Sequence, residues 1–210
     1  MSKKKNMEAA ETSAAPLVQS DWDLVQRHRY GDPQAFEEVY ERYGQMVFNL
    51  AYRMCGDREL AADLTQDSFL RIFRAVDRFR GRSSLKTWIY RVALNVCRSR
   101  LRRKRWNLQP LAEDDGPGVE LRDPGRGPEQ RAIARDQGRR VAQALLEVPE
   151  VFRSAVVLCD LQGLSYEEIA EVLGIRLGTV RSRIARGRDR LRVILERQQE
   201  EDDAGEETRS

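Results

Sequence analysis

This sequence of 210 residues lacks most of the features that mark secreted, metal-binding or disulfide-stabilised proteins. Its three cysteines, Cys55, Cys97 and Cys159, lie far apart and form no C-x-x-C pair. A disulfide framework is therefore not expected, and we interpret them as reduced thiols that pack as small apolar residues, with a redox sensor as the alternative. His28 is the single histidine. Since no cysteine cluster accompanies it, we predict no metal site and interpret His28 as a surface residue.

Long apolar runs and catalytic motifs are also missing. No segment approaches the roughly 18 to 20 apolar residues that span a bilayer. The basic start of the chain, MSKKKNMEAAETSAAP, has no apolar core of a signal peptide. We therefore expect a cytoplasmic protein without a membrane segment. No nucleophile–base arrangement, phosphate-binding loop or metal-ligand cluster is recognisable, so we expect no cofactor and no enzymatic activity.

Charge is abundant but nearly balanced, with 37 basic and 34 acidic residues and a formal net charge of +3. The balance conceals segregation along the chain. Residues 98–105 hold six basic residues and no acidic one, and residues 176–192 hold seven arginines against one aspartate. Residues 196–210 hold seven acidic residues against two arginines. Local basic stripes on a nearly neutral chain indicate nucleic-acid contacts at defined places.

Apolar residues recur at intervals of three and four, which predicts helices along most of the chain. This pattern is interrupted by the segment NLQPLAEDDGPGVELRDPGRG, which has three prolines and four glycines. We expect an all-α protein with two small helical domains at 20–105 and 129–196, joined by a flexible acidic linker at 106–128. We also expect a disordered tail at 1–19 and a frayed acidic tail at 197–210. That acidic tail either aids solubility or covers the preceding arginine-rich helix electrostatically.

Local signals place several helix starts. Ser20, Asp32 and Asp57 each precede a periodic apolar segment and can act as N-caps, and Pro33 suits the first position of a helix. Residues 79–84, FRGRSS, do not continue the apolar pattern. They are predicted to form a loop whose serines cap the next helix.

The strongest local signal is the segment LSYEEIAEVLGIRLGTVRSRIARGRDRLRVIL. Ser165 and Glu168 form a capping box at the head of a short helix, and Gly174 stands where a left-handed residue would end that helix. A second helix is predicted to start at Gly178 or Thr179. Two helices joined by so short a turn predict a helix-turn-helix, whose second helix enters the major groove of DNA.

The predicted recognition helix has an arginine-rich face that suits DNA. Arginine can bind a guanine edge with two hydrogen bonds or hold a phosphate. The candidate duplex-binding residues are Arg176, Thr179, Arg181, Ser182, Arg183, Ala185, Arg186 and Arg188. A solvated arginine-rich helix of an interaction domain is the alternative.

A second candidate site lies in the first domain, where the loop FRGRSS precedes the aromatic and basic segment LKTWIYRVALNVCRSRLRR. This combination suits single-stranded DNA, whose bases stack on aromatic side chains while arginines hold the backbone. The candidate single-strand-binding residues are Phe79, Arg80, Gly81, Arg82, Ser83, Ser84, Trp88, Arg91, Asn95 and Arg98. The alternatives are a place in the helical core for Trp88 and a loop-anchoring role for Phe79.

Taken together, the blocks DLTQDSFLRIFR…FRGRSSLKTWIYRVALNVCRSRLRR and LSYEEIAEVLGIRLGTVRSRIARGRDRLR resemble the extracytoplasmic-function sigma factors, the smallest group of bacterial sigma factors. The resemblance implies that the two domains correspond to sigma regions two and four. It also implies a stress-response factor that binds core RNA polymerase, directs it to promoters with minus-ten and minus-thirty-five elements, and promotes DNA opening.

The resemblance further implies roles for single residues. The surface that docks on the clamp of the polymerase beta-prime subunit would comprise Asp63, Gln66, Asp67 and Leu70, although an ordinary solvated helix surface is the alternative. Loop 79–84 with Asn95 behind it would capture minus-ten bases. Arg181, Ser182 and Arg186 would read the minus-thirty-five element. Ala185 departs from the family pattern, because some members have a bulkier residue there.

The partners that the resemblance implies are core RNA polymerase, through its beta-prime clamp and beta flap, promoter DNA, and an anti-sigma factor, which in some cases holds such a protein at a membrane. The protein itself is expected to be cytoplasmic and nucleoid-associated. Two other classes remain open. A helix-turn-helix regulator that binds duplex DNA as a dimer would leave the first domain unexplained. An enzyme with a DNA-binding tail would need a catalytic set that the sequence lacks.

Overall fold

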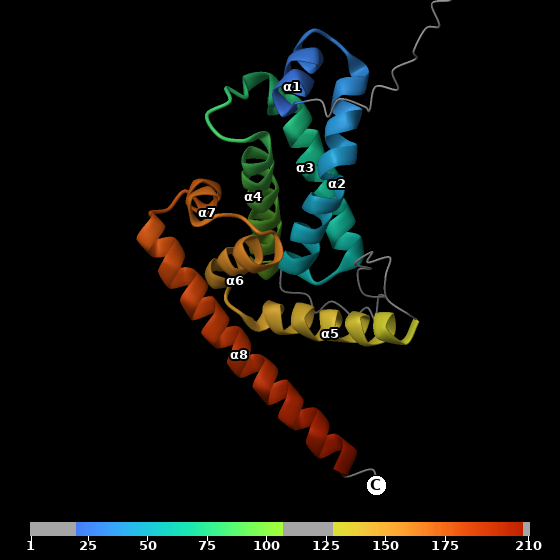
Figure 1. The fold of residues 1–210 in the computed structure, drawn as a ribbon, viewed down its shortest axis with the longest axis vertical. Helices are drawn as coiled ribbons and strands as arrows, with labels where there is room; N and C mark the ends of the chain where they lie inside the picture. Colours follow the sequence, from blue (N-terminus) through green and yellow to red (C-terminus); the bar gives the residue numbers. More distant parts are fainter. Residues whose placement is uncertain (1–19, 107–127, 208–210) are drawn as a thin grey trace, which may run out of the picture.

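The computed structural model describes residues 20–106 and 128–207, and both parts are helical (Figure 1). The first part comprises α1 (Asp21–Arg29), α2 (Pro33–Cys55), α3 (Arg58–Ala75) and α4 (Leu85–Trp106). The second part comprises α5 (Pro128–Glu147), α6 (Glu150–Val156), α7 (Tyr166–Leu173) and α8 (Leu177–Glu207). The all-α prediction is therefore confirmed. The tail at 1–19 and nearly all of the predicted linker lie outside the described residues.

The predicted N-caps are present in the structure. Each one accepts a hydrogen bond from a backbone N–H in the first turn of its helix: Ser20 before α1, Asp32 before α2 and Asp57 before α3. Pro33 occupies the first position of α2, and Gly56 ends that helix in the left-handed region at φ 75°. These residues supply partners to backbone groups that have none inside the helix, so the helix boundaries follow from local sequence.

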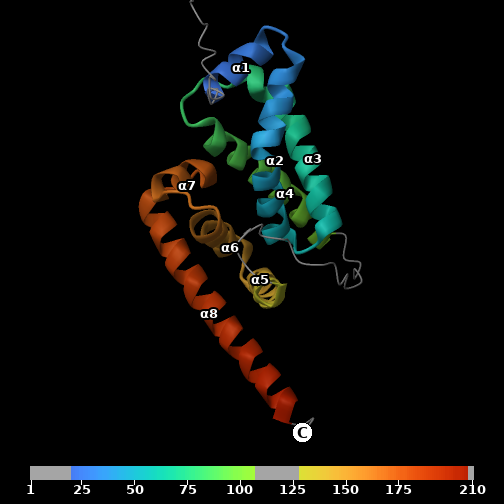
Figure 2. The same cartoon turned by 45° about the vertical axis from the view of Figure 1, so that its right-hand side comes forward.

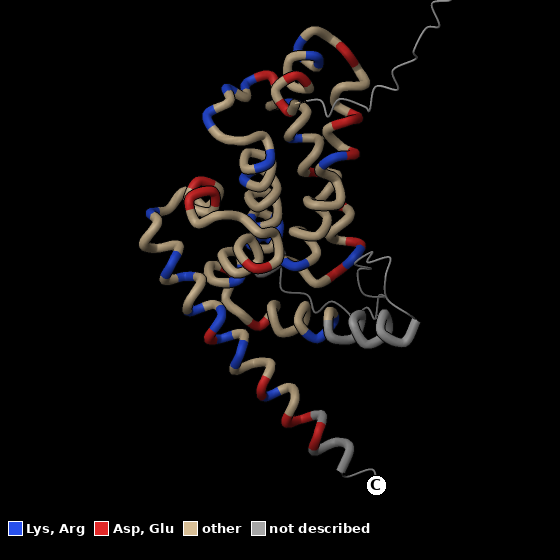
Figure 3. Tube along the Cα trace, viewed as in Figure 1, with Lys and Arg blue, Asp and Glu red and all other residues tan. Residues whose placement is uncertain are grey.

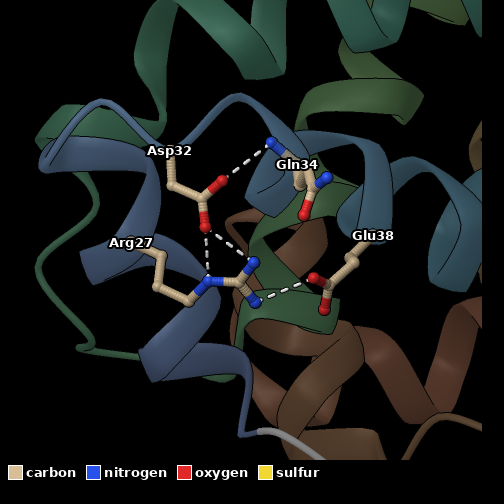
Figure 4. A network of polar contacts seen from close by, with 4 residues as sticks. All are labelled: Arg27, Asp32, Gln34 and Glu38. Carbon is tan, nitrogen blue, oxygen red and sulfur yellow. Dashed lines mark hydrogen bonds and ion pairs between the residues drawn. The ribbon is translucent and has the colours of Figure 1, made fainter.

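The corner between α1 and α2 is held by a network of ion pairs (Figure 4). Arg27 pairs with Asp32 at 2.6 Å and with Glu38 at 2.8 Å, while Asp32 also accepts from the backbone N–H of Gln34. The hydrogen bond from Arg27 lowers the pKa of Asp32, and the hydrogen bond to Glu38 raises the pKa of Arg27. Because Asp32 both caps α2 and binds α1, it fixes the direction of α1 relative to the longer helix.

The core of the first part lies between α2, α3 and α4, with α1 across one end of this bundle (Figures 1 and 2). The large, fully buried apolar side chains there come from all four helices and include Leu24, Leu50, Met54, Leu64, Ile72, Ile89 and Leu94. The apolar stripes that predicted these helices are thus the faces that pack.

The second part is organised along α8, a long helix that passes α6 and α5 (Figures 1 and 2). Close approach of α6 and α8 depends on Gly187, because a Cβ added there would lie 2.4 Å from Cγ2 of Val156 and 3.2 Å from the Phe152 carbonyl oxygen. After α6 the chain makes a π-helical turn, Val157–Leu161, before the loop that leads to α7.

The two parts pack against each other, and α7 lies beside α4. The Tyr90 hydroxyl of α4 donates to Gln162 Oε1 at 2.8 Å, and Arg153 of α6 donates to the carbonyl oxygen of Met54 at 2.6 Å. Burial raises the pKa of Tyr90, which therefore remains a neutral donor. The buried apolar side chains of the two parts also belong to one continuous cluster.

Three sequence predictions need correction. The acidic segment after Glu196 does not fray, because α8 continues to Glu207. Of its acidic residues, Glu200, Glu201 and Asp203 lie along the helix beyond Glu196 and do not fold back over Arg181 or Arg186 near its start (Figure 3). The helix also starts at Leu177, one residue before the predicted Gly178. His28 is not a surface residue, since its side chain is only 14% exposed and its ring packs against Phe73 at 5.1 Å between centroids.

Candidate nucleic-acid interface

The helix-turn-helix is built from α7 and α8. The Ser165 side chain accepts from the backbone N–H of Glu168, and Glu168 Oε2 accepts from the backbone N–H of Ser165 at 2.8 Å, which completes the predicted capping box. This backbone hydrogen bond lowers the pKa of Glu168. Gly174 ends α7 in the left-handed region at φ 65°. The buried Ile169 of α7 and Ile184 of α8 belong to the core that fixes the two helices relative to each other.

The first turns of α8 present the predicted duplex-reading face. Arg181, Ser182, Ala185 and Arg186 are all exposed. Neither Arg181 nor Arg186 has an ion-pair partner within 4.0 Å among the residues that the structure describes. The basic residues of α8 are concentrated in its first half, and Arg197 lies further along, where it pairs with Glu147 at 2.6 Å (Figure 3). Exposed guanidinium groups on one face of a helix that follows a short turn can reach base edges or phosphates.

The flanking candidates have different surroundings. Arg176 is exposed, whereas Thr179 is half-buried. Arg183 is half-buried and lines a crevice between the two parts of the chain. Arg188 donates to both carboxylate oxygens of Asp160, with Nε 3.0 Å from Oδ2. This hydrogen bonding raises the pKa of Arg188 and lowers that of Asp160, so part of the charge of Arg188 is already neutralised within the protein.

The loop between α3 and α4 exposes its arginines and buries its aromatic residue. Arg80, Gly81 and Arg82 are exposed, whereas Phe79 is 6% exposed and packs against Trp88 at 5.5 Å between ring centroids. The half-buried Trp88 and the buried Phe79 therefore support the anchoring alternative more than direct stacking on bases. Ser83 is half-buried, and Ser84 Oγ caps α4 by accepting from the backbone N–H of Thr87 at 3.0 Å.

Further along α4, the predicted single-strand residues meet the second part of the chain. Arg91 Nε donates to the carbonyl oxygen of Glu171 at 3.1 Å. Arg98 Nε pairs with Glu150 at 2.6 Å, and its Nη2 donates to Ser154 Oγ at 3.0 Å. Asn95 is exposed but lines the same crevice between the two parts. In this arrangement, α6 and α7 cover part of the face of α4 that the sequence assigns to DNA. No local sequence pattern predicts these partners, because they lie more than fifty residues away along the chain.

A separate apolar groove of about 660 Å³ lies between α2 and α3. Two residues of the predicted polymerase-docking surface, Gln66 and Leu70, line this groove. The other two, Asp63 and Asp67, are exposed on the same helix. The groove also includes four aromatic residues of the apolar faces of α2 and α3, namely Phe36, Tyr40, Phe69 and Phe73. Tyr40, Leu70 and Phe73 are each about half exposed, at 50%, 49% and 49%. The sequence signal that could have revealed this groove is the width of the apolar faces of α2 and α3, which is greater than one bundle core can cover.

Within the described residues, no group of three or more histidine, cysteine or acidic side chains is placed to hold a metal ion. The helices of that part of the chain are too short or too polar to span a membrane. The candidate sites consist of exposed arginines, a basic loop and an apolar groove.

Comparison with known families agrees with this arrangement. Residues 39–107 match the family described as Sigma-70 region 2, and residues 138–191 match the family described as Sigma-70, region 4. The chain therefore belongs to the sigma-70 family, whose non-enzymatic members serve transcription initiation by RNA polymerase.

Within this family, its relatives are extracytoplasmic-function (ECF) RNA polymerase sigma factors. It is 40% identical over 164 residues to the ECF RNA polymerase sigma factor SigE of Mycolicibacterium smegmatis, covering 77% of this chain and 62% of that protein. It is 37% identical over 176 residues to the ECF RNA polymerase sigma-E factor of Haemophilus influenzae, covering 81% of this chain and 92% of the relative. The ECF RNA polymerase sigma factor SigW of Bacillus subtilis is 32% identical over 176 residues, which cover 81% of this chain and 94% of that protein.

Two solved structures share the fold. CnrH, in complex with the cytosolic domain of CnrY, is 25% identical with a TM-score of 0.64, over 85% of this chain and 98% of that one. The sigma factor RpoE of Bartonella quintana, in complex with the anti-sigma factor NepR, is 23% identical with a TM-score of 0.61, over 77% of this chain and 96% of that one. The match of the first part to region 2 accounts for the domain that a lone helix-turn-helix regulator would leave unexplained.

Proposed function

We propose that this sigma factor docks on core RNA polymerase through the α2–α3 groove, contacts the minus-thirty-five element with α8, and captures the unpaired minus-ten strand with loop 79–84. The observation that carries the proposal is the exposure of three chemically distinct surfaces on one chain. The groove is apolar and has the acidic residues Asp63 and Asp67 beside it, α8 has exposed arginines, and loop 79–84 is short and basic. An apolar groove suits a protein partner, whereas exposed guanidinium groups suit DNA.

Docking on the polymerase is tested by charge reversal beside the groove. We expect Asp67→Lys to weaken assembly with core polymerase while the melting temperature of the isolated protein stays unchanged, because Asp67 is exposed and lies outside the core. Glu200→Lys, an equal change at an exposed position of α8, is the matched control and should assemble like the parent. Equal holoenzyme formation by Asp67→Lys and the parent would contradict this part of the proposal.

Recognition of the minus-thirty-five element is tested on α8. We expect Arg181→Ala or Arg186→Ala to lower promoter affinity by about 1–3 kcal/mol if the arginine reads a base. Arg192→Ala is the matched control, because Arg192 is 67% exposed on the same helix and lies beyond the predicted reading face. Unchanged binding of Arg181→Ala to every minus-thirty-five variant would show that the proposed register of α8 is incorrect.

The promoter class is best identified by run-off transcription on genomic fragments with reconstituted polymerase. A gel shift with and without core polymerase separates the proposal from a dimeric regulator. We expect specific promoter binding only with the polymerase, since α6 and α7 cover part of the predicted DNA-binding face of α4 in the isolated chain. Tight, specific binding by the isolated protein would favour the regulator.

An anti-sigma factor is part of the proposal as a partner class. Support comes from the RpoE–NepR complex, whose sigma chain shares this fold, as does CnrH bound to the cytosolic domain of CnrY. The crevice between the two parts, lined by Asn95, Arg98, Glu150 and Arg183, is a candidate surface for such a protein. Co-purification of a protein that blocks assembly with core polymerase is the expected result.

A further inference from the structure

The entrance to loop 79–84 is held by α1, an element that none of the predicted sites includes. Arg29 Nη2 donates to the carbonyl oxygen of Asp77 at 2.8 Å and also to the carbonyl oxygen of Phe79. Both carbonyl groups belong to the chain segment that enters the loop, nearly fifty residues after Arg29 in the sequence. One guanidinium group therefore joins the end of α1 to the base of the loop.

A second residue of α1 contacts the middle of the loop. A Cβ built on Gly81 would lie 3.2 Å from Cζ3 of Trp22, so the indole ring rests against the backbone of Gly81, whose φ is +66°. The Trp22 ring also lies 6.3 Å from the Phe79 ring between centroids. The ring is 45% exposed, so this contact is made at the surface and not within the core.

The two α1 residues also support each other. The Arg29 guanidinium carbon lies 5.6 Å from the centroid of the Trp22 ring, within the range of a cation–π contact. A planar guanidinium can stack on an aromatic ring while its N–H groups bind carbonyl oxygens, which the ammonium group of lysine cannot reproduce. Arg29 and Trp22 thus form one brace, with a polar contact to the base of the loop and an apolar contact to its middle.

We propose that Trp22 and Arg29 are positioning residues that hold loop 79–84 in the shape in which it captures the unpaired DNA strand. The proposal rests on the function proposed for this loop. A short loop that contains glycine and exposed arginines would otherwise lose conformational freedom when it binds a strand. Ordering the loop in advance removes that entropy cost from the binding step and so increases affinity.

The brace itself is tested without DNA, by limited trypsin digestion of the full chain. Arg80 and Arg82 are exposed cleavage sites within the loop, and cleavage there requires local opening of the backbone. We expect Arg29→Ala and Trp22→Ala to accelerate cleavage after these two residues several-fold, as followed by mass spectrometry. Cleavage at the parental rate in both variants would overturn the proposal.

Two matched controls separate the brace from general destabilisation. Tyr30→Ala removes an aromatic ring that is 88% exposed at the end of the same helix. Arg58→Ala removes another arginine that stacks on an aromatic ring, Phe48, at 5.9 Å. Both controls should be cleaved in the loop at the parental rate. If they accelerate loop cleavage as much as the brace variants do, the effect is not specific to Trp22 and Arg29, and the proposal fails.

The consequence for DNA is tested with holoenzyme and a forked fragment of a promoter obtained from the run-off assay, with an unpaired minus-ten strand. We expect Arg29→Ala to weaken binding to the fork about tenfold. Binding to the duplex minus-thirty-five fragment and to core polymerase should stay at the parental level. Arg29→Lys should restore little of the lost affinity, because it keeps the charge but not the brace.

The salt dependence distinguishes a brace from a direct phosphate contact. Loss of a phosphate contact lowers the slope of log affinity against log salt by about one, whereas loss of a brace leaves the slope unchanged. A lowered slope, or full recovery with lysine, would overturn the proposal. If the parent itself gained no affinity from the unpaired strand, the function proposed for the loop would fail instead, and the trypsin result would still decide the role of the brace.

Discussion

Replacing Gly187 with alanine should leave the protein no more stable than the parent, or less stable, although alanine favours helices. In the interior of a helix, a change from glycine to alanine stabilises by roughly 0.8–1 kcal/mol. At Gly187, however, the added Cβ would lie 2.4 Å from Cγ2 of Val156 and 3.2 Å from the Phe152 carbonyl oxygen. A valine side chain has few rotamers and a backbone carbonyl cannot rotate away, so α6 and α8 must separate. Such overpacking costs about 1–3 kcal/mol, which exceeds or cancels the helix gain.

The matched comparison is Gly138→Ala in α5, where an added Cβ meets no atom of the described residues within 4 Å. The same chemical change should raise the free energy of unfolding there by up to about 1 kcal/mol. Urea denaturation followed by far-UV circular dichroism should therefore rank Gly138→Ala above the parent and Gly187→Ala at or below it. The two variants should differ by about 1–3 kcal/mol. If Gly187→Ala were as stable as Gly138→Ala, the close packing of α6 on α8 would be wrong.

Three further predictions concern the N-cap of α7 at Ser165, the pH dependence of Glu168, and the ion pair between Glu150 and Arg98. Ser165→Ala should lower the free energy of unfolding by about 1 kcal/mol in urea titrations, because it removes the N-cap of α7. Since the folded-state pKa of Glu168 is lowered, its stabilising contribution is present above the ordinary glutamate pKa and is lost as pH falls through the folded value. The stability difference between the parent and Glu168→Gln should therefore shrink on acidification, and a constant difference would refute this. Glu150→Gln removes an ion pair of the half-buried Arg98, worth about 0.2–1 kcal/mol. Urea denaturation should show a loss of this size in the free energy of unfolding, and an unchanged value would mean that this pair does not stabilise the contact between the two parts.

The sequence alone was sufficient for the features that depend on near neighbours in the chain. The N-caps at Ser20, Asp32 and Asp57 and the capping box at Ser165 each involve groups within one helical turn, so the residues that decide them stand side by side in the sequence. The short turn that begins at Gly174, between α7 and α8, also depends on near neighbours in the chain. For this reason the helices and the helix-turn-helix were predictable.

Only the tertiary structure decided which apolar and basic residues are available to a partner. Phe73 and Phe79 look alike in sequence, yet Phe73 is 49% exposed in the α2–α3 groove, while Phe79 is 6% exposed at the start of loop 79–84, against Trp88. Arg98 carries the same charge as Arg181, but α6 provides Glu150 at 2.6 Å for Arg98. These differences arise because exposure and pairing depend on which helices meet in space. Helices meet through side chains that are far apart in the sequence, where periodicity and capping signals contain no information.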